Sequence, residues 1–208
     1  MLKNILKENI GYLTAFIVLL IISLVVKLYF SEYVLSIDNS VSDFFQIKLV
    51  NEGNTTFMKI VTFFGSAIPF IVIVLLTFLL IKNKSYSFYM FVNLLWVYVV
   101  SVVFKNVIMR NRPIISLIEK PKGYSFPSGH TMCSVAFYGF IVYLLLKNVK
   151  NYFLKWLIVF IFSMLVIFIG ISRIYLNVHY FTDVIAGLIL GLICLLMIIN
   201  IYIKNEKQ

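Results

Sequence analysis

Charged residues are scarce in this sequence. They make up 12% of its 208 residues, whereas a soluble domain contains about 25%. Acidic residues are the scarcer sign, with eight Asp and Glu against 18 Lys and Arg, and there are only two histidines. This composition excludes a soluble globular domain. Few residues remain that could move a proton or hold an anion, so their positions are informative.

Cysteine is equally rare, since Cys133 and Cys194 are the only two. Both lie inside apolar runs and are not spaced as a metal-binding pair. We therefore exclude a disulfide framework and interpret both as small core residues. The net charge of +10 would favour a nucleic-acid partner in a soluble protein. Here we expect the lysines to flank membrane spans and contact anionic lipids, with no nucleic-acid partner.

Long apolar runs dominate the rest of the chain, which is 62% hydrophobic. A span needs about 20 apolar residues, and a backbone surrounded by lipid must be helical. We predict one domain, residues 1–208, that is an all-α integral membrane protein with six transmembrane helices in one bundle. The expected spans lie at about 10–30, 57–81, 87–108, 130–147, 153–171 and 182–203. Lys3 and Lys7 precede the first run, but no cleavage pattern follows it, so it is a retained span.

Two loops are long, at about 31–56 and 109–129. The first is either irregular or a short interfacial helix capped by Asp38 or Ser40, and we favour the interfacial helix between the first and second spans. In the last span, Gly187 and Gly191 predict close packing against a neighbouring helix of the same bundle rather than a dimer contact. The oligomeric state stays open.

The orientation follows from the loop charges. The basic residues divide equally, nine on each side of the membrane. If Lys105, Arg112 and Arg173 serve chemistry instead of topology, the balance becomes nine to six. Because positive loops stay in the cytoplasm, we expect both termini to be cytoplasmic and the polar motifs described next to face outward.

His179 and Asp183 stand four residues apart at the start of the last span. On a helix this spacing places them on one face. The carboxylate could then accept a hydrogen bond from one ring nitrogen and raise the basicity of the other, as in activated nucleophiles. Asp183 is the only acid within or at the edge of spans two to six, which favours a functional role over simple stabilisation of a helix N-terminus.

Ser128 and Gly129 immediately precede a long apolar helix. Amides at a helix N-terminus can bind an anion, and glycine lets the backbone approach it closely. His130 in the first turn could give or take a proton near neutral pH. Alone, Pro-Ser-Gly is only a turn; followed by histidine and a span, it indicates an anion site.

Lys105 and Arg112 add cations, and Arg112 could hold a phosphate with two hydrogen bonds. Pro113 is expected to end the preceding helix. Arg173, in a short segment between two spans, is the third cation, whereas the role of Arg110 stays undecided. No carboxylate cluster suits magnesium, so these groups predict a phosphoryl-transfer site without a metal, in which cations and amides stabilise the phosphate oxygens.

Three stretches carry a resemblance to a known family. They read KNVIMRNRP from Lys105, PSGH from Pro127 and SRIYLNVHYFTD from Ser172. They resemble the KxxxxxxRP, PSGH and SRxxxxxHxxxD motifs of the type 2 phosphatidic acid phosphatase family, the membrane lipid phosphatases related to vanadium haloperoxidases. Every specified position matches, over a catalytic region of residues 105–183.

The resemblance implies a role for each matching residue. His179 attacks phosphorus and becomes a phosphohistidine, Asp183 orients it, and His130 protonates the leaving oxygen. Water then hydrolyses the intermediate, with neither metal nor cofactor. The implied phosphate ligands are Lys105, Arg112, Ser128, Gly129 and Arg173.

The expected function is therefore hydrolysis of a lipid phosphate or pyrophosphate that enters sideways from the bilayer. Phosphatidylglycerophosphate, undecaprenyl pyrophosphate and phosphatidate all fit, since the motifs hold phosphate and do not select the lipid. One alternative is a lipid phosphotransferase that uses the same site. A small transporter is disfavoured, because Pro69 is the only helix breaker within a span and no internal repeat is seen.

Overall fold

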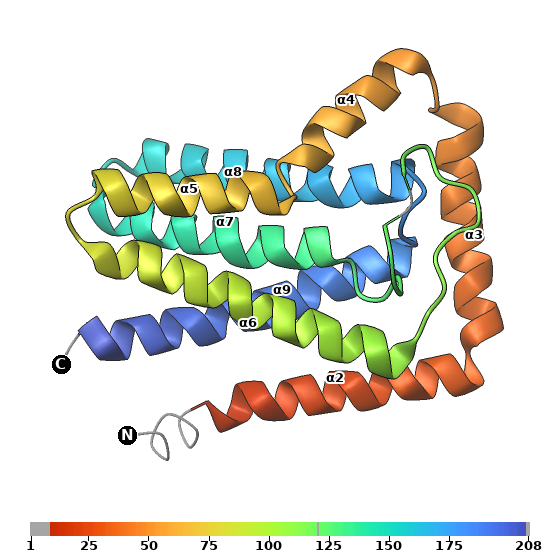
Figure 1. Cartoon of the computed structure of the whole chain (residues 1–208), viewed down its shortest axis with the longest axis horizontal. Coiled ribbons are helices and arrows are strands. Elements are labelled where there is room, and N and C mark those ends of the chain that lie inside the picture. Colours follow the sequence, from red (N-terminus) through yellow and green to blue (C-terminus); the bar gives the residue numbers. More distant parts are fainter. Residues whose placement is uncertain (1–8, 120, 207–208) are drawn as a thin grey trace.

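The computed structural model describes residues 9–119 and 121–206, so that Lys3 and Lys7 lie outside it. The described residues form helices and no strands, which confirms the all-α prediction (Figure 1). The helices are α2 (Ile10–Tyr29), α3 (Ser31–Lys48), α4 (Glu52–Phe63), α5 (Ala67–Leu80), α6 (Lys84–Ile108), α7 (Gly129–Asn148), α8 (Tyr152–Tyr175) and α9 (Phe181–Glu206).

Local side-chain contacts explain several helix boundaries. Asn51, Asn83 and Asn151 each accept a hydrogen bond from a backbone amide in the first turn of the helix that follows, which satisfies a donor that the helix itself cannot pair. The end of α6 differs from the prediction. The helix ends at Ile108, where Met109 adopts a left-handed conformation (φ 49°), and not at Pro113. The loop after α6 therefore begins before the proline.

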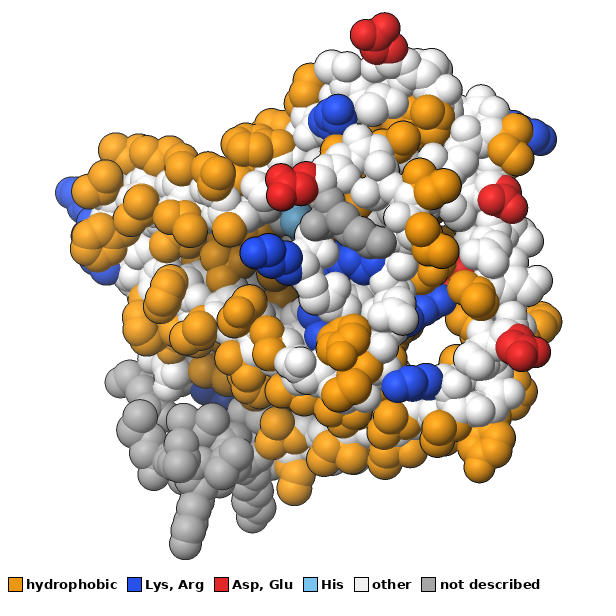
Figure 2. All heavy atoms as spheres, turned by 45° about the vertical axis from the view of Figure 1, so that its right-hand side comes forward, with side chains coloured by type: hydrophobic (Ala, Val, Ile, Leu, Met, Phe, Trp, Pro, Cys, Tyr) orange, Lys and Arg blue, Asp and Glu red, His pale blue; other side chains and the backbone are white. Residues whose placement is uncertain are grey.

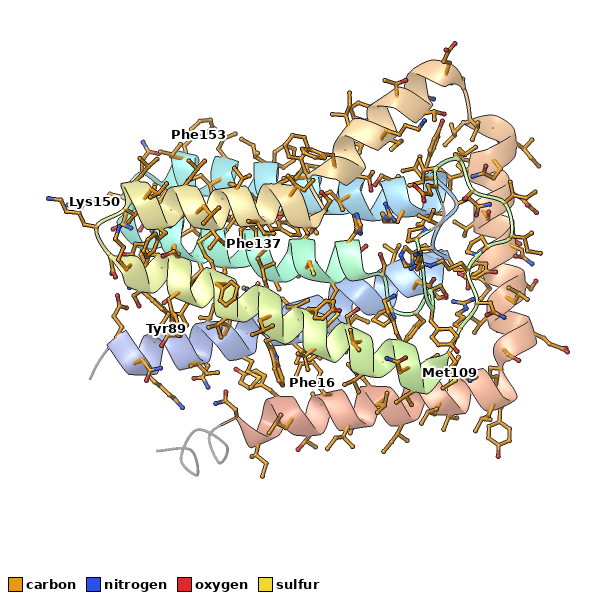
Figure 3. All side chains as sticks on the ribbon, in the orientation of Figure 1. Phe16, Tyr89, Met109, Phe137, Lys150 and Phe153 are labelled. Atoms are coloured by element: carbon orange, nitrogen blue, oxygen red, sulfur yellow. The ribbon has the colours of Figure 1, made fainter. Side chains whose placement is uncertain are left out.

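The core surrounds α7, which packs against α6, α8 and α9. Phe137 on α7 is fully buried, whereas Phe153 on α8 points away from the bundle (Figure 3). A Cβ on Gly187 would lie 2.8 Å from the carbonyl oxygen of Ser128, and one on Gly191 would lie 2.7 Å from that of Met132. Both glycines therefore bring α9 against the α7 backbone, which confirms the predicted packing within the bundle.

The outer surface is that of a membrane protein. Large apolar side chains such as Ile17, Leu75 and Trp156 are exposed. Figure 2 shows hydrophobic side chains over the flanks of the bundle, while several basic side chains gather near a histidine at the end that α3 crosses. Five of the described helices, α2, α6, α7, α8 and α9, are long and apolar enough to cross a bilayer.

The second predicted span is not one straight helix. Residues 64–66 separate α4 from α5, and the two helices are bent by 43°, so a sixth crossing exists only if they form one broken span. Gly65 lies at the bend, where a Cβ would stand 2.6 Å from a methyl carbon of Ile169. The carbonyl of Phe64, freed by the break, accepts a hydrogen bond from the hydroxyl of Tyr138 (2.7 Å). The break is thus held by α7 and α8.

Two helices replace the long loop expected at 31–56. The 18-residue helix α3 crosses the end of the bundle at which α6 ends and α7 and α9 begin (Figure 1). Asp38 is its one buried residue within the described chain. Because α3 begins at Ser31, neither Asp38 nor Ser40 caps it, and the predicted cap is wrong. The buried carboxylate of Asp38 instead holds the middle of α3 against the bundle and leads directly to the site.

Candidate active site

Backbone hydrogen bonds bring the three motifs together beneath α3. The amide of Ser128, just before α7, donates to the carbonyl of Asp183 in the first turn of α9 (2.9 Å). The amide of Ser125 donates to the carbonyl of Arg110 (2.8 Å). The turn that joins α8 to α9 folds back so that the amide of His179 donates to the carbonyl of Arg173 (3.3 Å). Segments far apart in sequence thus form one polar site at the bundle end.

His179 lies at the centre of this site and is 3% exposed. Its Nε2 lies 3.1 Å from Nη1 of Arg112, which can only donate, so Nε2 is the unprotonated nitrogen. Nδ1 therefore carries the proton and lies 3.5 Å from Oδ2 of Asp183. This is long for a hydrogen bond, although such contacts often tighten when a ligand binds. Burial lowers the pKa of His179 to about 4, against the opposing effect of Asp183, so the ring is neutral at pH 7.

Asp183 is completely buried, and its carboxylate contacts other groups besides His179. Its Oδ2 accepts a hydrogen bond from the amide of Tyr180 (3.0 Å), as the third residue of a helix does in a capping box. Its Oδ1 accepts one from Nη1 of Arg110 (2.8 Å). His179 precedes α9, so the expected shared helix face is wrong. The pair instead forms because Asp183 turns back to cap its own helix.

Arg110 and Asp38 are the residues that sequence reasoning missed. Arg110 pairs with Asp38 of α3 (2.5 Å) as well as with Asp183. Asp38 also accepts hydrogen bonds from the amide and the hydroxyl of Thr182, at 2.9 and 2.7 Å. An acid in the long first loop and a second arginine in KNVIMRNRP were the available signals, but their separation of 72 residues concealed the contact.

The predicted phosphate ligands of the first motif are held by backbone carbonyls. The ammonium of Lys105 donates to the carbonyls of Tyr124, Ser125 and Pro127 at 2.9, 3.2 and 2.8 Å. The guanidinium of Arg112 donates to those of Gly123, Tyr124 and Val178 as well as to His179. Both cations therefore tie residues 123–127 to the site, and their charges still act on its other ionisable groups.

Arg173 lies in the last turn of α8, not in a segment between spans, and is 2% exposed. Its Nη1 donates to Thr62 of α4 (2.6 Å), whereas its Nε has no hydrogen-bond partner among the described residues. A buried donor without a protein acceptor is costly and suits an anion that the chain itself does not supply.

The second motif completes the site. Ser128 is buried and its hydroxyl accepts a hydrogen bond from Thr131 (3.0 Å). Gly129 opens α7, and His130 follows in the first turn. His130 interacts electrostatically with His179, Arg112, Arg173 and Lys105. The structure thus places every residue predicted for the site at one end of the bundle.

The described part of the chain contains no group of three or more His, Cys, Asp or Glu placed to hold a metal ion. The site instead combines a neutral imidazole, a second histidine, three cations and the N-terminus of α7. These groups could hold a tetrahedral anion and direct an imidazole nitrogen at its centre.

An apolar cavity of about 380 Å³ adjoins the site. It lies between α2, α3 and the end of α6, with Arg110, Tyr180 and Thr182 in its wall. Lining by Ile22, Val26 and Val34 makes it suited to hydrocarbon rather than to a second polar group.

Comparisons with known proteins agree with this architecture. The sequence model of the PAP2 superfamily matches residues 85–207. Phosphatidylglycerophosphatase B of Bacillus subtilis (strain 168) is 37% identical over 99 residues, which are 46% of this chain and about half (48%) of that protein.

Two solved structures are similar over most of the chain. The crystal structure of a transmembrane PAP2-type phosphatidylglycerolphosphate phosphatase from Bacillus subtilis has a TM-score of 0.77 and 26% identity, covering 94% of this chain and 96% of its own. That of LpxE from Aquifex aeolicus has a TM-score of 0.60 and 23% identity, covering 79% and 95%, and supports the fold alone.

Proposed function

Because the chain belongs to the PAP2 superfamily, we propose that this multi-pass membrane protein is a phosphatase for a lipid phosphate or pyrophosphate. The observation that carries the proposal is the state of His179. Its unprotonated Nε2 faces the guanidinium of Arg112, and its Nδ1 faces the carboxylate of Asp183. A neutral histidine between an anion-binding cation and an orienting acid is suited to attack phosphorus.

In the proposed first step, Nε2 of His179 attacks phosphorus and the bond from phosphorus to the lipid oxygen breaks. His130 gives its proton to that leaving oxygen, and Asp183 stabilises the positive charge that develops on His179. In the second step, water attacks the phosphohistidine while His130 takes a proton from it. The P–N bond breaks, inorganic phosphate leaves, and both histidines return to their starting states.

The phosphate would be held by Arg112, Arg173 and the amides at the start of α7, and Lys105, whose three donors bind carbonyls, would attract it through its charge. Arg112 must then exchange its hydrogen bond to Nε2 for one to a phosphate oxygen, which frees the lone pair of His179. Arg173 offers its unpaired Nε. Cations and amides would stabilise the charge that develops on the phosphate oxygens, so we expect the reaction to need no metal and no cofactor.

The lipid is proposed to reach this site sideways from the bilayer. Drawing a tail of about 16 methylenes into water would cost about 0.8 kcal/mol for each, or more than about 10 kcal/mol. The apolar cavity between α2, α3 and α6 reaches Arg110 and Tyr180 at the edge of the site. A tail could lie there while the phosphate meets the cations. We further propose that α3 lies in the membrane interface, that both termini are cytoplasmic and that the site faces outward.

A panel of lipid substrates tests the proposal. Purified protein in detergent, without any acceptor alcohol, would be given phosphatidylglycerophosphate, undecaprenyl pyrophosphate, phosphatidate and diacylglycerol pyrophosphate. Release of inorganic phosphate from at least one of them is expected, and the ranked kcat/KM values identify the substrate. The His179→Ala variant is the matched control. Turnover that requires an added acceptor would instead show a phosphotransferase, and no turnover of any lipid would refute both.

A further inference from the structure

Arg110 touches two carboxylates, and neither it nor Asp38 belongs to the residues assigned above. We infer that Asp38 and Arg110 are positioning residues: Asp38 on α3 holds the guanidinium of Arg110, which holds the carboxylate of Asp183 and through it the proton-bearing nitrogen of His179. The inference rests on the proposed function for its kinetic consequences, but its structural part can be tested without turnover.

The contacts of Arg110 show that its donors are committed to the protein. Nη1 donates to Oδ1 of Asp183 (2.8 Å) and to the hydroxyl of Thr182 (2.7 Å), and Nη2 donates to Asp38. Its guanidinium carbon also lies 4.2 Å from the centre of the Tyr180 ring, a cation–π contact. A guanidinium held at both ends and on one face is fixed in orientation.

This environment distinguishes Arg110 from the phosphate ligands. Two carboxylates, Asp38 and Asp183, touch its single positive charge. A phosphate approaching that cluster would meet a net negative charge. Arg173, by contrast, donates to the hydroxyl of Thr62, forms no ion pair with an acid among the described residues and keeps its Nε unpaired. Arg110 is therefore placed to hold an acid rather than a substrate.

Asp38 connects this arginine to a different helix. Its carboxylate accepts three hydrogen bonds, from Nη2 of Arg110 and from the amide and hydroxyl of Thr182. The Thr182 amide belongs to the first turn of α9, where donors lack partners within the helix and negative charge is favoured. A residue of α3 thus fixes both the start of α9 and the arginine beside it.

The consequence for His179 follows from the two oxygens of Asp183. Arg110 binds Oδ1, which leaves Oδ2 directed at the amide of Tyr180 and at Nδ1 of His179. The Nδ1 contact is long, at 3.5 Å, so that a small rotation of the carboxylate would lose it. With that contact gone, Arg112 alone would favour the tautomer with an unprotonated Nε2, and the population of that tautomer would fall.

The first test measures the tautomer directly and needs no substrate. The chain has only two histidines, so the His130→Gln variant, labelled with ¹⁵N-histidine, reports on His179 alone. We expect ¹⁵N chemical shifts of a ring protonated at Nδ1. Arg110→Lys keeps the positive charge but loses the paired guanidinium donors that contact two carboxylates. This variant and Asp38→Asn should both shift the population toward the Nε2-protonated tautomer. Asp43→Asn, an exposed acid on the same helix, should leave the spectrum unchanged.

The second test separates positioning from phosphate binding by kinetics. Arg110→Lys and Asp38→Asn should lower kcat by about 10- to 100-fold, as loss of an orienting residue does. KM and the inhibition constant of inorganic phosphate should change less than about two-fold. In an Asp183→Asn background, Arg110→Lys should have almost no further effect on kcat, because groups that act as a unit are not additive.

Each remaining outcome decides the inference. Unchanged His179 signals in a folded Arg110→Lys protein would overturn it, and this variant decides alone if Asp38→Asn does not fold. An inhibition constant for phosphate that rises with the fall in kcat would show that Arg110 binds substrate. If the wild-type protein hydrolyses no lipid of the panel, the proposed function fails, while the tautomer measurement still decides whether Arg110 positions His179.

Discussion

Nε2 of His179 lies 3.1 Å from a guanidinium nitrogen of Arg112. The atom proposed to attack phosphorus therefore already faces the cation proposed to bind its target. A phosphate that accepts hydrogen bonds from Arg112 would occupy the space in front of Nε2.

Removal of the nucleophile gives the first prediction. His179→Ala should abolish turnover, with a loss of at least about 10⁴-fold in kcat, because the proposed acceptor of the phosphoryl group is gone. Asp183→Asn should cost about 10⁴-fold through loss of orientation and charge. Initial rates on a lipid from the panel measure both. Near wild-type activity of a folded His179→Ala protein would refute the mechanism.

The protonation state of His179 gives the second prediction. Burial lowers its pKa from the usual 6.5 to about 4, so the ring is neutral above pH 5 and becomes charged only as the pH falls through about 4. The nucleophile should therefore stay available between pH 5 and 8. An NMR titration of the His130→Gln protein without substrate measures the pKa of His179 directly. A midpoint near 6.5 would show that the ring is exposed to solvent and not buried.

Metal independence is the third prediction. Activity should survive EDTA, because Arg112, Arg173 and Lys105 provide the positive charge that a metal would otherwise supply. Vanadate should inhibit competitively, since it mimics five-coordinate phosphorus. The same assay with magnesium restored after chelation is the control. Loss of activity with EDTA and its recovery with magnesium would contradict this reading of the site.

The fourth prediction concerns orientation. Figure 3 places Lys150 at the end of the bundle opposite Met109, which follows α6 at the site. In a background without Cys133 and Cys194, Lys122→Cys should react with an impermeant thiol reagent in intact cells. Lys150→Cys should react only after the cells are opened. The reverse labelling would place the site on the cytoplasmic side.

The fifth prediction tests the contact between α7 and α9. A Cβ on Gly187 would lie 2.8 Å from the Ser128 carbonyl, so Gly187→Ala should destabilise the protein by about 1–3 kcal/mol and lower kcat by displacing Ser128. Gly11→Ala in α2 is the matched control, because nothing lies within 4 Å of its Cβ. Thermal unfolding in detergent compares the two variants. Equal unfolding temperatures would show that the two helices can move apart enough to accommodate the added methyl group without loss of stability.

The sequence predicted the helical class and the site residues because both depend on composition and on residues close together in the chain. Apolar length identified the spans, and the three motifs gathered the histidines and cations. The break at Gly65 was missed although glycine and serine stand together there. The reason is that the break depends on contacts with Ile169 and Tyr138, which no local pattern reveals.

The charge network was missed for the same physical reason. Asp38 and Arg110 meet across 72 residues. From the sequence, Asp38 was interpreted as a possible helix cap, and the role of Arg110 stayed undecided. The four-residue spacing of His179 and Asp183 pointed to the correct pair through an incorrect geometry. The contact is made by a helix cap and a turn, not by one face of a continuous helix.

The glycine contact between α7 and α9 has a mechanical consequence. Because Gly187 and Gly191 place α9 directly against backbone atoms of α7, the two helices are in backbone contact where they approach the site. Spans tilt when the thickness of a bilayer changes. Here α7 and α9 should tilt as one body and carry the amides proposed to bind the phosphate together with His179, so the geometry of the site should be insensitive to the acyl-chain length of the surrounding membrane.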